Sequence, residues 1–438
     1  MTANVGSATG SLSSRAWLIW ALGAGLFCYG FFHRNAPSVM IDPLMRDFMV
    51  GGAILGNLSA FYFYAYASLQ IPVGLMIDRW GPRRMLALGA LLCGAGSALF
   101  AAADSLTLAY IGRLLIGSGA AVGFVGTLKL ATNWFSPDRF AQLTGLTMMA
   151  GMVGGIGGQA PLAALVEVAG WREALFGAAA IGGLLAVAIW LIVRDLPPRS
   201  VASVHDGLDG KATEGGTANG LSDLLRGLGI VIRERQNWLV SLVCAAMTAP
   251  LLAFAGLWGV AWLMQTHGLD RPEAAGTASL LLIGWAVGSP ASGWLSDRTG
   301  LRLPVLQAGA LLGLLSLSAL LYLPDMPALP RAALFLASGA GLGSMAIGFA
   351  ILRRVNSPKV TGAAFGLLNG ACVGSGAVFQ PLIGALLDRG WDGALIEGAR
   401  LYSAGAYTAA LSVLIGFLAA GFAVSFLIRE PQPRAATA

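Results

Sequence analysis

The chain has 438 residues, of which 56% are hydrophobic and only 11% are charged, and its formal net charge is +6. A soluble domain carries roughly 25% charged residues, so this composition excludes an ordinary soluble protein and predicts a membrane protein. The positive charge does not indicate nucleic-acid binding, because almost all basic residues fall between apolar segments.

Twelve long apolar segments follow one another along the chain. Each is long enough to cross a hydrocarbon core of ~30 Å as a helix and too long for a barrel strand. They cover residues 16–40, 54–77, 84–103, 105–133, 138–166, 171–194, 238–265, 274–297, 302–323, 330–354, 360–388 and 404–428. We therefore predict an all-α membrane protein with twelve transmembrane helices, whose many glycines allow close helix packing.

The sixth and seventh apolar segments are separated by a polar stretch that begins near Pro197-Pro198. Its composition predicts a flexible linker between two six-helix bundles. The predicted organisation is an N-terminal tail (1–15), a first bundle (16–194), a linker (195–236), a second bundle (237–428) and a C-terminal tail (429–438).

The basic residues are unevenly shared between the two sides of the membrane. If the N-terminus is cytoplasmic, the inner loops and tails hold 18 of the 27 Lys and Arg residues, the outer loops hold six, and three lie inside spans. Because positive charge concentrates on the cytoplasmic side, we expect a multi-pass inner-membrane protein with both termini in the cytoplasm.

One motif occurs once in each half. Residues 74–84 read Gly-Leu-Met-Ile-Asp-Arg-Trp-Gly-Pro-Arg-Arg, and residues 293–302 read Gly-Trp-Leu-Ser-Asp-Arg-Thr-Gly-Leu-Arg. Both have the spacing Gly-x-x-x-Asp-Arg-x-Gly, 219 residues apart. The duplicated loop resembles the signature loop of the major facilitator superfamily (MFS) of secondary transporters. This resemblance implies two pseudo-symmetric six-helix bundles with the substrate between them.

The resemblance also implies a gate. In the superfamily the loop Asp bridges to the opposite half, often at the N-terminal end of helix 11, where the helix dipole favours an anion. Here we expect Asp78 to act as the latch, although the same charges could serve only to set topology. The gate residues are Gly74, Asp78, Arg79, Gly81, Arg83 and Arg84 in the first copy, and Gly293, Asp297, Arg298 and Gly300 in the second.

Three basic residues, Arg34, Arg113 and Lys129, lie inside predicted spans, and no acidic residue lies clearly at mid-depth. Charges at bilayer depth are costly and are functional candidates by default. A basic cavity without a partner carboxylate favours an anionic substrate that supplies the missing charge.

Arg34 ends an aromatic run, Phe31-Phe32-His33-Arg34, and precedes Pro37. This pattern resembles helix 1 of the organic anion branches of the superfamily, where an Arg binds carboxylate or phosphate. The planar guanidinium suits both groups because it donates two parallel hydrogen bonds. The alternative is that Arg34 snorkels to the surface.

Arg113 resembles the second signature of the superfamily, in helix 4, which is associated with proton coupling. A structural hydrogen bond to neighbouring carbonyls is the alternative. His33 titrates near neutral pH and could carry a proton, although a packed neutral His is the favoured interpretation. Lys129 could face the cavity or snorkel to the cytoplasm.

Further candidates for the substrate path come from spacing. Tyr62 and Tyr66, like Trp258 and Trp262, are four residues apart and share a helix face, although such pairs also pack cores. The polar candidates are Gln159 and Gln380, which are repeat-related at an offset of 221, and Asn369.

We therefore predict a monomeric secondary transporter of a small organic anion, possibly with a coupling proton. Alternatives are a bulkier solute (a siderophore, drug or short peptide) and a transporter-like sensor. The sequence does not indicate an enzyme. It has only three His residues, and we find in it no buried acid pair, no metal-ligand cluster and no nucleotide-binding loop, so the usual catalytic groups are missing. We expect no cofactor and no metal.

Overall fold

The computed structural model describes residues 6–136, 139–197, 229–323, 325–357 and 360–429. The predicted linker (195–236) lies largely outside the described residues, as do parts of both predicted tails. In the described part, eleven helices are long and apolar enough to cross a membrane, or twelve if the bent pair Ile41–Phe48 and Gly52–Gln70 is one span.

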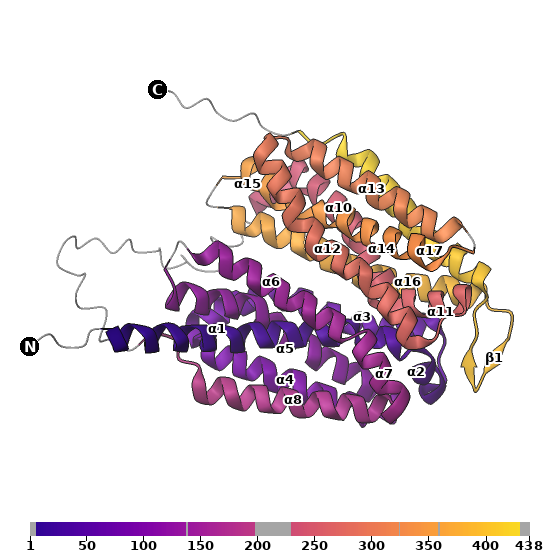
Figure 1. The fold of residues 1–438 in the computed structure, drawn as a ribbon, viewed down its shortest axis with the longest axis horizontal. Coiled ribbons are helices and arrows are strands. Elements are labelled where there is room, and N and C mark those ends of the chain that lie inside the picture. The colour runs from indigo at the N-terminus through magenta and orange to yellow at the C-terminus, as the bar shows by residue number, and fades with distance from the viewer. Residues whose placement is uncertain (1–5, 137–138, 198–228, 324, 358–359, 430–438) are drawn as a thin grey trace, which may run out of the picture.

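The first half of the chain forms one helical bundle and the second half forms another, and they lie side by side (Figure 1). The first contains α1 (Gly6–Asn35), η1 (Ala36–Val39), α2 (Ile41–Phe48), α3 (Gly52–Trp80), α4 (Pro82–Ala101), α5 (Leu106–Trp134), α6 (Phe140–Gly157), α7 (Ala160–Ala169) and α8 (Trp171–Ile192). Large apolar side chains such as Leu184 and Leu191 stay exposed on its surface, which fits a lipid surrounding.

The second bundle ends in a helix that follows a short hairpin. It contains α10 (Arg235–Ala249), η4 (Pro250–Trp258), α11 (Gly259–His267), α12 (Arg271–Thr299), α13 (Arg302–Tyr322), α14 (Ala328–Gly343), η5 (Ser344–Ala346), α15 (Ile347–Val355), α16 (Thr361–Arg389), β1 (Leu395–Ile396), β2 (Ala399–Arg400) and α17 (Ala404–Ser425). The strands β1 and β2 pair antiparallel.

Several predicted spans are broken rather than continuous. The first ends as an α-helix at Asn35 and turns through η1, which contains Pro37. In the seventh, η4 is a π-helix that begins at Pro250. Proline has no N–H to continue the α pattern and clashes with the preceding turn, so a wider turn accommodates it. These breaks expose backbone groups where the two bundles meet.

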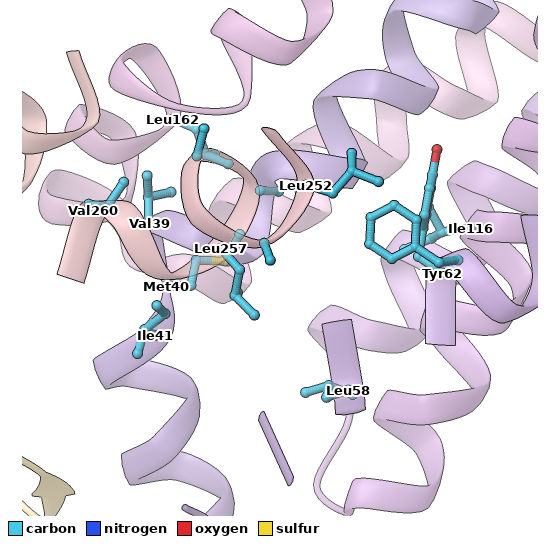
Figure 2. Packing of buried hydrophobic residues seen from close by; sticks show 14 of the residues in the cluster. Val39, Met40, Ile41, Leu58, Tyr62, Ile116, Leu162, Leu252, Leu257 and Val260 are labelled. Carbon is cyan, nitrogen blue, oxygen red and sulfur yellow. The ribbon is translucent and has the colours of Figure 1, made fainter. Parts of the chain in front are cut away.

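The two bundles share one buried apolar cluster (Figure 2). Val39 and Leu162 come from the first bundle, and Leu252 and Leu257 come from the second; all four are at most 5% exposed. The end of the molecule that carries β1 and β2 is called the hairpin end. The opposite end, with Asp78 and Asp297, is called the signature-loop end.

Candidate functional site

The two ends of the interface between the bundles differ. At the hairpin end, Gln159 of the first bundle donates to the Ala255 carbonyl (2.6 Å) and accepts from the Ser279 hydroxyl (2.6 Å) of the second. At the signature-loop end, a Cβ added at Gly74, Gly145, Gly293 or Gly366 would meet nothing within 4 Å. The interface is therefore closed at the hairpin end, while these four glycines, one each on α3, α6, α12 and α16, have free space beside them.

Arg34 lies on the last turn of α1, where the negative end of the helix dipole favours a cation. Its guanidinium carbon is 4.8 Å from the centre of the Phe31 ring and 5.5 Å from that of Phe63. Its charge also acts on Tyr66 of α3 and Cys372 of α16, so it lies between the bundles. Among the described residues, no hydrogen bond or ion pair engages this guanidinium.

The Arg113 side chain is hydrogen-bonded to backbone carbonyls of neighbouring helices. It donates to the His33 carbonyl (2.8 Å) and the Ser59 carbonyl (3.0 Å), and it lies over the Tyr62 ring. The side chain is 1% exposed, and these bonds tie α5 to α1 and α3. The arrangement is the structural alternative foreseen for this residue.

His33 is 1% exposed and packs edge-on against Tyr29 and Phe32. Its Nε2 has no hydrogen-bond partner, and no ion pair involves it, among the described residues. The geometry is that of a packed imidazole rather than of a group on the open path.

The aromatic candidates differ in exposure. Tyr62 is 2% exposed and donates to the Gly30 carbonyl (3.1 Å), while Tyr66 stacks on it and is half-buried. Trp258 is fully buried and donates to the Gln380 carbonyl (3.0 Å), and Trp262 is also buried. Of the four, Tyr66 alone combines partial exposure with proximity to Arg34; the other three are core residues in this conformation.

The polar candidates Gln380 and Asn369 differ in how deeply they are buried. The Gln380 amide donates to the Leu252 carbonyl (2.8 Å) and is fully buried, while its own amide oxygen has no partner within the described structure. Asn369 is half-buried on α16, one turn before Cys372. The Asn369 side chain makes no hydrogen bond with another described residue.

Lys129 does not reach Arg34. Its ammonium forms a 2.7 Å ion pair with Asp78, and the two side chains are 41% and 65% exposed. They line a cavity of about 310 Å³ at the signature-loop end, together with Gly74 and Thr132. Asp78 is therefore paired within its own bundle, and it makes no described contact with the second bundle.

The signature loops themselves are turns with left-handed glycines. Gly81 has φ +82° and Gly300 has φ +71°, a region that side-chain-bearing residues avoid. In the first loop the Arg83 backbone N–H donates to Asp195 (2.7 Å), and the Arg83 side chain donates to the Trp190 carbonyl. Arg79, Arg84, Asp297 and Arg298 are exposed.

Two carboxylates with clear roles were not singled out from the sequence. Asp195 holds the first signature loop, and Asp388 joins the two bundles at the hairpin end. Each follows or ends an apolar segment, and sequence alone gives it no partner. The part of the chain with described coordinates contains no group of three or more His, Cys, Asp or Glu that could hold a metal ion.

The family model described as Major Facilitator Superfamily matches residues 22–381. The chain belongs to the major facilitator superfamily. The fold implied by the duplicated signature loop is confirmed, and the family is one of membrane transporters rather than of enzymes.

Individual relatives are distant. The chain is 27% identical over 282 residues to a probable sulfoacetate transporter, SauU, of Cupriavidus necator; the match covers 63% of this chain and 64% of that protein. It is 25% identical over 336 residues to the membrane sensor protein UhpC of Salmonella typhimurium, covering 73% of each. A solved bacterial homologue of the human lysosomal transporter Spinster, in an inward-facing and unoccupied conformation, has a TM-score of 0.77 at 19% identity, covering 94% of this chain and 97% of that one.

Proposed function

We propose that this MFS transporter carries a small organic anion, which binds at Arg34. The proposal rests on the surroundings of the Arg34 guanidinium. It lies between the bundles, flanked by two aromatic rings, with no hydrogen bond or ion pair from any described residue. The Arg34 side chain is half-buried, and a guanidinium that is partly withdrawn from water without a partner is costly. An anionic substrate would supply that partner.

The chemistry of the group narrows the substrate class. A guanidinium donates two parallel hydrogen bonds to a carboxylate, sulfonate or phosphate, and no described residue accepts a hydrogen bond from that of Arg34. Tyr66 and Asn369 are the further side chains that we propose to contact the substrate. The name of the relative SauU, a probable sulfoacetate transporter, is consistent with a carboxylate or sulfonate solute.

We further propose that the signature-loop end faces the cytoplasm, because the basic residues concentrate there. The present conformation is then open to the inside, and the chain is a monomer of the inner membrane. In the opposite conformation Asp78 would leave Lys129 and latch the signature-loop end against the second bundle. We do not assign proton coupling to Arg113, because both of its terminal nitrogens already donate to backbone carbonyls.

A sensor without a transport cycle is the second candidate, favoured by the similarity to UhpC. Both candidates bind a solute, so binding and transport must be measured separately. The first test is a thermal-shift screen of the purified protein against carboxylates, sulfonates, phosphate esters and their neutral isosteres. A ligand that binds only the folded state raises stability by mass action.

We expect anions alone to stabilise the protein, and Arg34→Ala to abolish the effect. Stabilisation by a bulky neutral or cationic solute would contradict the anion proposal. Uptake of the stabilising anion into proteoliposomes then distinguishes a transporter from a sensor, which would bind the solute without moving it.

A further inference from the structure

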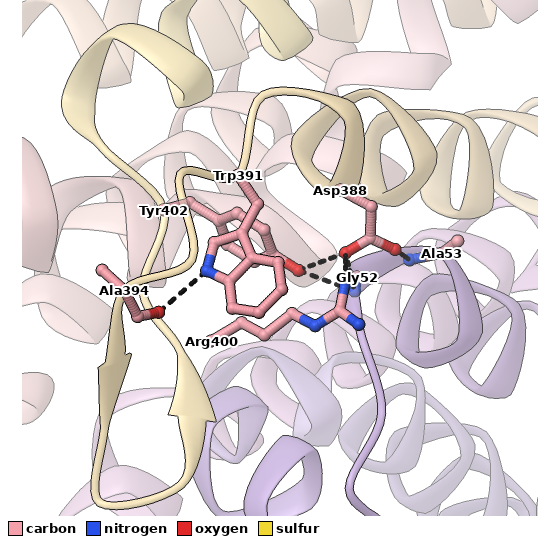
Figure 3. Close-up of polar contacts among 7 residues, drawn as sticks. All are labelled: Gly52, Ala53, Asp388, Trp391, Ala394, Arg400 and Tyr402. Atoms are coloured by element: carbon pink, nitrogen blue, oxygen red, sulfur yellow. Dashed lines mark hydrogen bonds and ion pairs between the residues drawn. The ribbon is translucent and has the colours of Figure 1, made fainter.

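At the hairpin end, one carboxylate of the second bundle caps a helix of the first. Asp388, on the last turn of α16, accepts from the backbone N–H of Gly52 (2.8 Å) and of Ala53 (2.9 Å) at the start of α3 (Figure 3). The first N–H groups of a helix lack intrahelical partners, and the dipole there favours an anion. The N-cap of α3 is Gly51, which has no side chain to cap it.

The segment after α16 holds this carboxylate in place. Tyr402 donates its hydroxyl to Asp388 (2.5 Å), and the Arg400 guanidinium forms a 3.0 Å ion pair with the same oxygen. Arg400 also lies over the Trp391 ring at 4.3 Å. Burial, together with the Asp388 carboxylate, raises the pKa of Tyr402, so the phenol keeps the proton that it donates.

Close approach of the two helices makes the cap possible. A Cβ at Gly52 would lie 2.8 Å from the Gly384 carbonyl oxygen, and a Cβ at Gly384 would overlap the Gly52 carbonyl. A Cβ at Gly51 would lie 2.5 Å from the Asp388 carboxylate. Glycine at these positions lets α3 and α16 approach until the carboxylate reaches the helix end.

Two further ion pairs cross the interface nearby. Arg46 pairs with Glu397 (2.9 Å), and Arg271 pairs with Asp42 (3.1 Å). Glu397 is 77% exposed, and exposed pairs contribute little. The Asp388 side chain is 22% exposed and receives four donors, so it is the dominant polar contact between α3 and α16 at this end.

The internal repeat does not reproduce this contact. Glu167 is the counterpart of Asp388 in the first bundle, yet it is exposed and makes no hydrogen bond or ion pair with the described residues. The helix that it would cap, α12, is capped by its own Asp270, which accepts from the Glu273 N–H (2.8 Å). The cap in trans is therefore specific to α3 and α16.

We propose that Asp388, held by Arg400 and Tyr402, is the latch that keeps the hairpin end closed, and that it must leave the N-terminus of α3 before this end opens. The contact exists only while the bundles meet at this end. Its loss therefore destabilises the closed conformation and leaves the open one unchanged. The hairpin segment becomes a gating element, because it positions the carboxylate.

The test measures the distance between the bundles at the hairpin end by double electron–electron resonance. Spin labels are placed at Val168 and Glu273, which are exposed on α7 and α12, in a background without native cysteines. We expect Asp388→Asn to shift the population ratio toward longer distances by roughly tenfold, the size of one lost charge-assisted hydrogen bond. An Asn side chain at position 388 can accept at one oxygen only, and its NH₂ group would face one of the two backbone N–H groups at the start of α3, so two donors would repel each other.

The matched control is Asp392→Asn, on the same segment, because Asp392 bonds only to the nearby Ala394 N–H; it should leave the distances unchanged. Gly384→Ala keeps every charge but blocks the approach, so it should shift the distances in the same direction. Parental distances in Asp388→Asn would overturn the latch. If that variant does not fold, parental distances in both Gly384→Ala and Arg400→Gln would overturn it. The measurement needs no substrate, so it stands or falls independently of the anion proposal.

Discussion

Replacing Arg34 with Lys tests the proposed binding site most directly. The substitution keeps the positive charge but exchanges a planar group with five N–H donors for a single ammonium. Because no described residue hydrogen-bonds the guanidinium, the substrate supplies the acceptors in the proposed complex. Losing one charge-assisted hydrogen bond costs about 1.5–3 kcal/mol, which weakens binding by about 10- to 150-fold.

The assay is the dissociation constant of the stabilising anion, measured by calorimetry on purified Arg34→Lys, with uptake into proteoliposomes as a second readout. Arg34→Ala should be at least as damaging, while the protein remains in the membrane. Arg15→Lys is the matched control, because Arg15 lies on the same helix and is exposed. Wild-type affinity in Arg34→Lys, or a cationic substrate, would refute the role of Arg34.

From the sequence alone, Arg46 would serve as the neutral control, since it lies in a predicted outer loop. The structure excludes that choice, because Arg46 pairs with Glu397 across the two bundles at 2.9 Å. A control for substrate binding should leave even a weak contact between the bundles in place.

Three further predictions concern the gate, the topology and Arg113. Asp78→Asn should abolish or greatly slow uptake while the protein stays inserted, because the signature-loop end loses its proposed latch; normal turnover would show that the loop only sets topology. Cysteines at Ser203 and Thr437, outside the described residues, should resist an impermeant maleimide applied to intact cells, and ready labelling would reverse the proposed orientation. Arg113→Lys should lower the free energy of unfolding by about 1–3 kcal/mol for a carbonyl left unpaired, and an unchanged unfolding temperature would contradict its structural role.

The architecture could be predicted because it depends on composition and on repetition. Long apolar segments must be helices when they cross lipid, and the duplicated loop indicated two halves. The breaks in the helices were harder to predict. Pro37 indicated the end of α1, but nothing in the apolar segment 238–265 distinguished the π-helix at Pro250 from an ordinary kink.

The partners of the polar side chains could not be predicted, because they depend on how the bundles sit against each other. Lys129 was open between two interpretations until the structure showed its pair with Asp78. Trp258 and Trp262 were predicted from their spacing to share a helix face, but Trp258 ends the π-helix η4 and Trp262 lies in α11, and both are buried in this conformation. Asp388 ends an apolar segment in the sequence, and that position does not reveal that its hydrogen-bond donors come from both bundles.

The repeat explains why sequence symmetry was a useful but incomplete guide to function. Gln159 and Gln380 are equivalent in the repeat, and both are buried near the interface. Yet Gln159 bonds across it to the second bundle, whereas Gln380 bonds within its own. Asp388 and Glu167 differ in the same way. A transporter must close at one end while it opens at the other. A contact that stabilises only one of these conformations must therefore differ between the two halves of the repeat. Such contacts are therefore to be sought where repeat-related residues have different partners, as at Asp388.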